Sequence, residues 1–185
     1  MNNLMLDLET FGKKAGAAIV SIAAVQFDLA TGKTGKTFYQ NIDLQSCLNA
    51  GLKVSGDTVM WWMKQEEKAR RKLTENTLDI QRALSAFNEF IDSIPIDEFA
   101  EYNDLGLKIW GNSARFDLGI LEVAYTALKA EAPWKYYNER DVRTLVSFAP
   151  EIKQNMTFEG VPHDALADCY HQIKYCSAIY QKLFN

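Results

Sequence analysis

Residues 17–27 read Ala-Ala-Ile-Val-Ser-Ile-Ala-Ala-Val-Gln-Phe, an almost unbroken apolar run. A run of this length without polar alternation is typical of a β-strand that other parts of the protein cover on both faces. The Thr31-Gly32 pair that follows is a turn signal, and residues 34–41 then read as the partner strand of a hairpin. The run therefore predicts a central strand inside a sheet whose two faces are both covered.

Strands and helices alternate around this hairpin. Residues 3–8 read as a short strand before it, and residues 108–110 read as another that runs into Gly-Asn-Ser. Asp57 is the expected N-cap of the first helix. Helices are predicted from cap residues, breakers and apolar side chains at helical spacing over 58–72, 79–94, 114–130, 141–148 and 164–184. Strands followed by strand–helix alternation indicate an α/β fold with a mixed sheet flanked by helices.

Length and composition favour a single globular domain over residues 1–185. The chain is 48% hydrophobic and 24% charged, which excludes a disordered chain. No apolar run approaches the 18 residues of a membrane span, so we expect no membrane association. The first residues lack a basic segment and a long apolar stretch, so no cleaved signal peptide is expected. Three cysteines without metal-ligand spacing suggest free thiols, and we expect a cytoplasmic protein.

The charge balance limits how the chain would approach nucleic acid. With 20 basic and 24 acidic residues, the formal net charge is −4. This balance argues against binding phosphates through bulk electrostatics. Acidic residues that gather around divalent cations would still allow an approach to phosphates, because the ions reverse the local charge.

Four carboxylates lie at the ends of the predicted elements. Asp7 and Glu9 are two apart on the first strand, so their side chains share a face. Neighbouring carboxylates repel unless a cation or proton lies between them. Taken alone, this pair also fits a solvated strand end. Asp117 lies in the first turn of the helix after 108–110, where a carboxylate also fits the helix N-terminus electrostatically.

His163 and Asp168 form the third group. His163 precedes the last predicted helix, and Asp168 lies in its first turns, so the two can meet at one site if His163 is on the loop. A histidine that caps the end of a loop is the alternative. His171, the only other histidine, has no accompanying carboxylates and is expected to be packed or solvated.

The order Asp-x-Glu, then Asp, then His-x4-Asp is far more specific than any of its parts, and through it the chain resembles the DEDDh 3′–5′ exonucleases. Three motifs carry the resemblance, Leu-Asp-Leu-Glu-Thr-Phe-Gly from residue 6, Arg-Phe-Asp-Leu-Gly-Ile-Leu from residue 115 and His-Asp-Ala-Leu-Ala-Asp from residue 163. The chain is most similar to small stand-alone phage and bacterial exonucleases, exoribonuclease-like members included. The resemblance implies a ribonuclease H-like fold with a five-stranded mixed sheet, three strands antiparallel and then two parallel. We place the fifth strand near Tyr136–Glu139.

The resemblance also implies the roles of the site residues. Two divalent cations, Mg²⁺ or Mn²⁺, would activate a water and stabilise the leaving oxygen, and hard cations prefer oxygen ligands. The implied reaction releases 5′-mononucleotides from 3′ ends of single-stranded DNA or RNA, or of 3′ overhangs. The metal ligands would be Asp7, Glu9, Asp117 and Asp168, and the general base His163.

Other residues are candidates for contacts with the substrate. Thr10 matches the position whose backbone lies against the terminal nucleotide, while Phe11 departs from the threonine of many members and leaves the substrate open. Trp61 and Trp62 precede a basic stretch over 64–72, so either could stack on a base. Adjacent helical side chains point about 100° apart, so one tryptophan should pack inward. A homodimer interface is the alternative for the exposed one. Arg115 could meet a phosphate.

Three other functions compete with this interpretation. Aspartyl-phosphate phosphatases also place acids after the first strand, but they use Asp-x-Asp, and here Glu9 occupies the second position. A nucleic-acid 3′-end binding module that has lost catalysis would not need all five catalytic-type residues. A ribonuclease H-like endonuclease would share the metals but would cut circular substrates.

Overall fold

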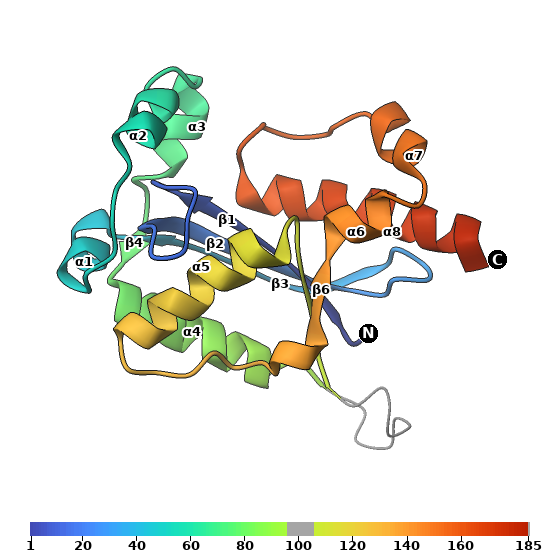
Figure 1. Cartoon of the computed structure of the whole chain (residues 1–185), viewed down its shortest axis with the longest axis horizontal. Helices are drawn as coiled ribbons and strands as arrows, with labels where there is room; N and C mark the ends of the chain where they lie inside the picture. Colours follow the sequence, from blue (N-terminus) through green and yellow to red (C-terminus); the bar gives the residue numbers. More distant parts are fainter. Residues whose placement is uncertain (96–105, 185) are drawn as a thin grey trace.

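A computed structural model of the chain describes residues 1–95 and 106–184. They form a mixed sheet with helices on both faces (Figure 1). The strands are β1 (Asn3–Thr10), β2 (Ile19–Phe27), β3 (Thr34–Ile42), β4 (Thr77–Leu78), β5 (Lys108–Gly111) and β6 (Glu139–Asp141), in the order β4-β3-β2-β1-β5-β6. β1, β2 and β3 pair antiparallel, and β5 and β6 continue the sheet in parallel beyond β1. The predicted α/β class is confirmed. The prediction of five strands is wrong, because the two-residue β4 pairs parallel to β3 and adds a sixth.

Helices cover both faces of the sheet. The helices are α1 (Leu44–Asn49), α2 (Gly56–Trp62), α3 (Glu67–Lys72), α4 (Ile80–Asp92), α5 (Ala114–Ala127), α6 (Val142–Val146), α7 (Pro150–Asn155) and α8 (Ala165–Phe184). α4 and α5 pack on one face, while α8 packs on the other together with α6 and α7 (Figure 1). Among the described residues, no helix combines the length and apolar character that crossing a bilayer requires.

The alternation of side chains along β1 decides on which face of the sheet its carboxylates lie. Leu4, Leu6 and Leu8 belong to the apolar cluster that includes α4 and α5 residues. Met5 points to the opposite face, into the cluster with α8. Because side chains alternate along a strand, Asp7 and Glu9 continue the Met5 row and emerge on the α8 face.

The predicted central strand is confirmed in β2. All nine of its residues are buried, because β1 and β3 pair with its two edges and helices cover its two faces. β1, which carries the first motif, lies between β2 and β5 and is therefore a central strand as well.

The single helix predicted over 58–72 is wrong. The chain forms α2 and α3 with a turn between them. The turn is closed by backbone hydrogen bonds that span three residues, from Lys64 N to the Trp61 carbonyl at 3.1 Å and from Gln65 N to the Trp62 carbonyl at 3.0 Å. The side-chain amide of Gln65 also donates to the Trp61 carbonyl at 3.0 Å. Asp57 lies in the first turn of α2 and is not its N-cap, a position that Ser55 occupies.

The fifth strand of the prediction lies slightly later than expected. Residues Tyr136–Asn138 form a 3₁₀ turn, and the strand that pairs with β5 runs over Glu139–Asp141. Pairing with Ile109, Trp110 and Gly111 sets this register. The other predicted helices are present, with bounds shifted by up to three residues.

Candidate active site

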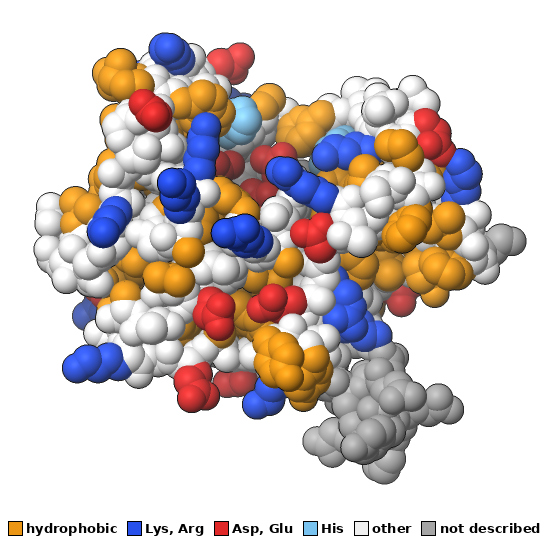
Figure 2. All heavy atoms as spheres, viewed as in Figure 1, with side chains coloured by type: hydrophobic (Ala, Val, Ile, Leu, Met, Phe, Trp, Pro, Cys, Tyr) orange, Lys and Arg blue, Asp and Glu red, His pale blue; other side chains and the backbone are white. Residues whose placement is uncertain are grey.

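Three carboxylates converge where β1 emerges beneath α8. One oxygen atom from each of Asp7, Glu9 and Asp168 lies within 4.8 Å of the other two. The first two residues come from β1, and the third comes from the first turn of α8, so the sheet and the helix build the cluster together. Figure 2 shows acidic side chains at the floor of a hollow, with basic side chains around it.

The fourth acid lies deeper, beside the same cluster. Asp117 is 2% exposed, and its Oδ1 accepts a hydrogen bond from the Leu8 backbone N–H at 3.2 Å. Gly111 at the end of β5 leaves room for this side chain, because a Cβ there would lie 3.1 Å from Asp117 Cβ and Oδ2. Asp117 therefore joins the end of β5 to the strand that carries Asp7.

Burial and mutual repulsion keep these acids from ionising at their usual pH. Burial raises the pKa of Asp7, and the charges of Asp117, Glu9 and Asp168 raise it further. Burial, followed by the charge of Asp168, raises the pKa of Glu9 to about 9. Burial also raises the pKa of Asp117 to about 7 and that of Asp168 to about 6. Such a cluster is stabilised by bound protons or by cations.

The donor set fits hard divalent cations. Its donors are carboxylate oxygens, which Mg²⁺ and Mn²⁺ prefer. The neighbouring thiol of Cys169 is turned away, because its Sγ contacts the carbonyl oxygens of Met5 at 3.6 Å and Ala23 at 3.7 Å. The site therefore offers oxygen ligands without a soft sulfur ligand.

Gln172 belongs to the site although the sequence interpretation did not include it. Its Nε2 donates a hydrogen bond to Asp7 Oδ1 at 2.8 Å, and its side chain is buried. Gln172 lies four residues after Asp168 on α8, so both residues face β1. That spacing is the sequence signal that would have identified it.

His163 stands in the turn before α8, as the sequence interpretation required. Its φ of 62° is in the left-handed region, which non-glycine residues seldom adopt. Its ring packs edge-on against Trp61, with centroids 4.8 Å apart, and lies 6.3 Å from the ring of Trp62. The turn thus brings the imidazole to the tryptophan pair of α2.

One tryptophan packs inward, as predicted, and it is Trp62. Trp62 is 3% exposed, and its indole N–H donates a hydrogen bond to the Thr10 carbonyl at 3.0 Å. Trp61 is 37% exposed beside His163. Trp62 therefore anchors α2 to the end of β1, and Trp61 remains accessible.

Asp164 and Lys72, which the sequence interpretation also did not include in the site, hold the His163 turn. The Asp164 carboxylate accepts a hydrogen bond from Leu166 N at 3.1 Å at the start of α8, and it forms an ion pair with Lys72 of α3. The charge of Asp164 also raises the pKa of Asp168 and Glu9. The last residue of the basic stretch thus binds a carboxylate of the protein itself. The position of Asp164 at the start of the last helix is the available sequence signal.

The remaining candidates lie around this centre. The Thr10 hydroxyl donates to the Gly12 carbonyl at 2.6 Å, and the half-buried Phe11 packs against two apolar clusters. Arg115 is exposed at the start of α5. The ring of His171 packs between those of Phe158 and Tyr175, which matches the packing role expected for it.

One known protein is similar to this chain in sequence, and two solved structures are similar to it in fold. The exodeoxyribonuclease of Enterobacteria phage T4 is 23% identical over 210 residues, which cover 94% of this chain and 86% of the phage protein. The nuclease domain of 3′hExo, a DEDDh family member solved with rAMP, aligns with a TM-score of 0.62 at 11% identity over 97% of this chain and 92% of that domain. Exonuclease I aligns with a TM-score of 0.67 at 17% identity over 98% of this chain, which spans 43% of that longer chain. These likenesses confirm the ribonuclease H-like fold.

The family model of the 3′–5′ exoribonuclease Rv2179c-like domain matches residues 2–180, almost the whole chain. The match includes the β1 carboxylates, the start of α5 and most of α8. The chain therefore belongs to the Rv2179c-like 3′–5′ exoribonuclease family and is a 3′–5′ exonuclease of the DEDDh class.

Proposed function

We propose that this exonuclease removes nucleotides from the 3′ ends of single strands, or of 3′ overhangs, releases 5′-mononucleotides and requires two Mg²⁺ or Mn²⁺ ions. The observation that carries the proposal is the convergence of Asp7, Glu9 and Asp168 within 4.8 Å in a site that raises their pKa values. A fold that holds carboxylates against their mutual repulsion is suited to binding cations.

Asp7, Glu9, Asp117 and Asp168 would hold the ions. When bound, such ions neutralise the carboxylates, activate the nucleophile and stabilise the charge of the departing oxygen. Gln172 orients Asp7 through its hydrogen bond of 2.8 Å. The Leu8 N–H orients Asp117 in the same way at 3.2 Å, so neither carboxylate has to reorganise during the reaction.

His163 would act as the general base that accepts a proton from the attacking water. Its ring is held against Trp61, and the ion pair between Asp164 and Lys72 holds the turn behind it. Trp61 is exposed beside His163 and would stack on a base of the substrate. Thr10 and Phe11 would contact the terminal nucleotide.

The matching family and the phage relative differ in the sugar of the nucleic acid that their names specify. The matching family is described as an exoribonuclease, whereas the phage T4 relative is an exodeoxyribonuclease. We therefore propose single-stranded nucleic acid as the substrate class, with RNA and DNA tested side by side.

The test is digestion of matched RNA and DNA oligonucleotides, labelled at the 5′ end, with Mg²⁺, Mn²⁺ or EDTA. We expect a ladder that shortens one nucleotide at a time from the 3′ end, with 5′-mononucleotides as products and no activity in EDTA. The Asp7→Ala variant should lose several orders of magnitude in rate. Activity that survives in EDTA or in this variant contradicts the metal assignment.

Two further outcomes identify the alternatives. Binding of 3′ ends without turnover under any metal would identify a binding module. Cleavage of a circular single strand would identify an endonuclease, because a circle has no 3′ end.

A further inference from the structure

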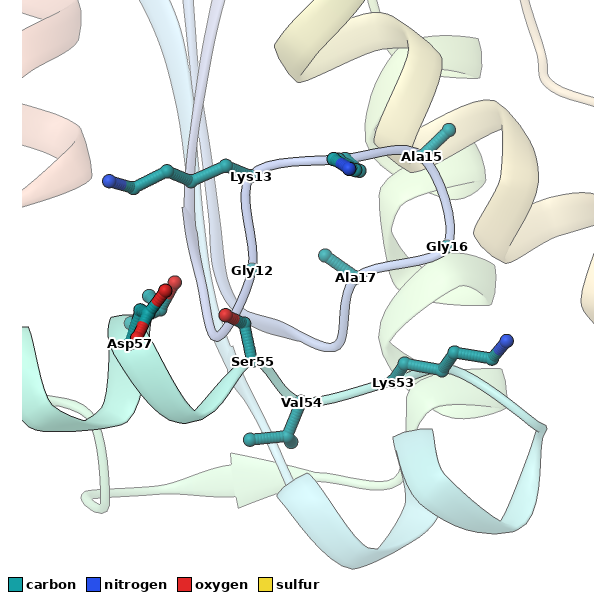
Figure 3. Close-up of a pocket in the computed structure, with 11 residues that line it drawn as sticks. Gly12, Lys13, Ala15, Gly16, Ala17, Lys53, Val54, Ser55 and Asp57 are labelled. Atoms are coloured by element: carbon teal, nitrogen blue, oxygen red, sulfur yellow. The ribbon is translucent and has the colours of Figure 1, made fainter.

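The loop that follows the first motif borders a cavity distinct from the carboxylate floor. A cavity of about 550 Å³ lies between residues 12–17 and residues 53–58. Figure 3 shows Lys13 and Lys53 extending to opposite sides of it, with Gly12 and Gly16 in the loop between them. Lys14 also lines the cavity, and Asp57 is the one acidic residue in its lining.

A second cavity lies on the other side of the same loop. This cavity of about 700 Å³ shares Lys13 and Lys14 with the first and extends to Ser113 and Arg115 at the start of α5. The shared lysines make the two hollows one continuous surface. Among the described residues that line it, the acidic ones are Asp57 and Glu122, so basic side chains outnumber acidic ones four to two.

The positive charge of this surface is not neutralised by ion pairs. Within the part of the chain that the structure describes, the ion pairs of basic side chains involve Arg71, Lys72, Lys174 and Lys182, and none of the four basic residues on this surface. In the basic stretch of residues 64–72, two of the five basic side chains are paired, since Lys72 binds Asp164 and Arg71 binds Glu67.

The loop is built in advance of any ligand. Lys53 N donates to the Gly16 carbonyl at 2.8 Å, and Ser55 N donates to the Phe11 carbonyl at 2.7 Å. A Cβ on Gly12 would lie 2.9 Å from Ala17 Cβ, so the Gly12 backbone packs closely against the Ala17 side chain. These contacts fix the backbone from which the lysine side chains extend along the cavity.

The backbone of this surface lies within a few residues of the carboxylates along the chain. Lys13 follows Glu9 by four residues, and Arg115 precedes Asp117 by two. A polyanion whose end reaches the carboxylates would therefore meet these cations next along its length. A single strand carries one phosphate per nucleotide, and lysine and arginine side chains bind such phosphates without reading the base.

We propose that the loop of residues 12–17, with Lys53 and Arg115, binds the phosphates of the nucleic-acid strand upstream of its 3′-terminal nucleotide. This inference rests on the proposed function and adds the path of the strand. The cations supply affinity for substrates long enough to reach them. A dinucleotide, which ends at the linkage that is cleaved, does not reach these cations, so they add nothing to its affinity.

The test is the double variant Lys13→Gln plus Lys14→Gln, compared with Lys33→Gln plus Lys135→Gln. The control removes the same charge from exposed residues outside both cavities. Binding of a fluorescent 12-nucleotide strand with a phosphorothioate 3′ linkage is measured by anisotropy between 50 and 200 mM salt. KM is measured in parallel for a 12-nucleotide strand and a dinucleotide.

We expect the loop variant to weaken binding of the 12-nucleotide strand by about ten-fold at low salt. The slope of log affinity against log salt should fall by about 1.4, since each lost contact on a single strand contributes about 0.7. The ratio of the two KM values should shift by a similar factor against the longer strand. The control pair should retain the wild-type slope and ratio.

Equal losses in both double variants, an unchanged salt slope, or equal losses on the dinucleotide and the longer strand would each overturn the inference. Wild-type protein that binds the strand but hydrolyses neither oligonucleotide would instead overturn the proposed function. The salt slope of the loop variant still decides the inference in that case, because binding is measured without turnover.

Discussion

At the scale of single residues, the site depends on which groups oppose the repulsion among its acids. Gln172 donates to Asp7 Oδ1 at 2.8 Å, and this bond lowers the pKa of Asp7 against the larger effects of burial and of the neighbouring carboxylates. Asp117 has the Leu8 N–H in the same role. A few uncharged donors therefore help to keep the acids available for cations.

The Gln172→Leu variant should need a higher pH for activity. Losing the hydrogen bond disfavours the charged form of Asp7, so its pKa rises and protons compete longer with the metal. At subsaturating Mn²⁺, the acidic limb of the pH–rate profile should move to higher pH. Gln181→Leu is the matched control, because Gln181 donates to the Ala30 carbonyl away from the acids. An unshifted limb in Gln172→Leu would contradict this role.

His163→Ala should lose about 10²–10⁴-fold in single-turnover rate, the usual contribution of a general base. Metal binding should persist, because His163 is not proposed as a ligand, and the thermal shift caused by Mn²⁺ reports it. His171→Ala is the control: its ring packs against Phe158 and Tyr175, so the variant should change stability and leave the rate nearly unaltered. Near wild-type rates in His163→Ala would show that the base is another group.

At the scale of elements, α2 and α3 form a bridge between the end of β1 and the start of α8. Trp62 binds the Thr10 carbonyl, and Lys72 binds Asp164. Asn41 of β3 fixes the end of α3, because its Nδ2 donates to the carbonyls of Lys72 and Glu75 at 2.7 Å. The break between the two helices lets Trp62 and Lys72 reach different elements.

Substitutions of the two tryptophans of α2 should affect different properties, stability for Trp62 and substrate binding for Trp61. Trp62→Ala removes a buried ring and a hydrogen bond and should lower the free energy of unfolding by about 3–5 kcal/mol in urea titrations. Trp61→Ala should leave that energy nearly unchanged and weaken single-strand binding by about 1–3 kcal/mol. Trp62→Phe keeps most of the apolar ring and should cost about 1 kcal/mol for the lost hydrogen bond. The opposite pattern would reverse the assignment of the two rings.

At the scale of the whole molecule, the sheet gathers residues that are remote in sequence. The acids come from β1, from α5 and from α8, and they meet because α8 crosses β1 while α5 starts where β5 ends. Packing on both faces of the sheet holds these elements together. The packing of the fold therefore holds the acids close together despite their mutual repulsion.

Metal-free protein should lose stability as pH rises. The folded pKa values of Asp168, Asp117 and Glu9 are raised to about 6, 7 and 9, so the folded state holds protons that the unfolded state has released. The stability due to these protons is complete below about pH 4, where unfolded acids titrate, and falls through the folded pKa values. Thermal melts in EDTA from pH 4 to 9 measure it.

Divalent cations should counter that loss. At a hundred times the dissociation constant, Mn²⁺ should add about 2.7 kcal/mol, which is roughly 5–10 °C in Tm for a chain of this size. The shift should grow with pH and shrink in Asp168→Ala. A shift that is independent of pH and of Asp168 would place the ion elsewhere.

The sequence alone predicted the longer strands and helices and the acids proposed for the site. Hydrophobic patterning defined β2 and α8 because each buries a continuous apolar surface of its own. The motif order predicted Asp7, Glu9, Asp117, His163 and Asp168 as the site residues, since such a combination of residue types seldom occurs by chance. Short elements such as β4, α1 and α7 were missed because they carry too few residues for a periodic pattern.

Only the tertiary structure decided how these residues are supported. The break after Trp62, the bond from Gln172 to Asp7 and the ion pair of Asp164 with Lys72 depend on contacts between distant segments. Local sequence propensity does not predict such contacts, because their free energy arises only when the segments pack. The same holds for the loop at Lys13, whose cavity exists because residues 53–55 pair with its backbone.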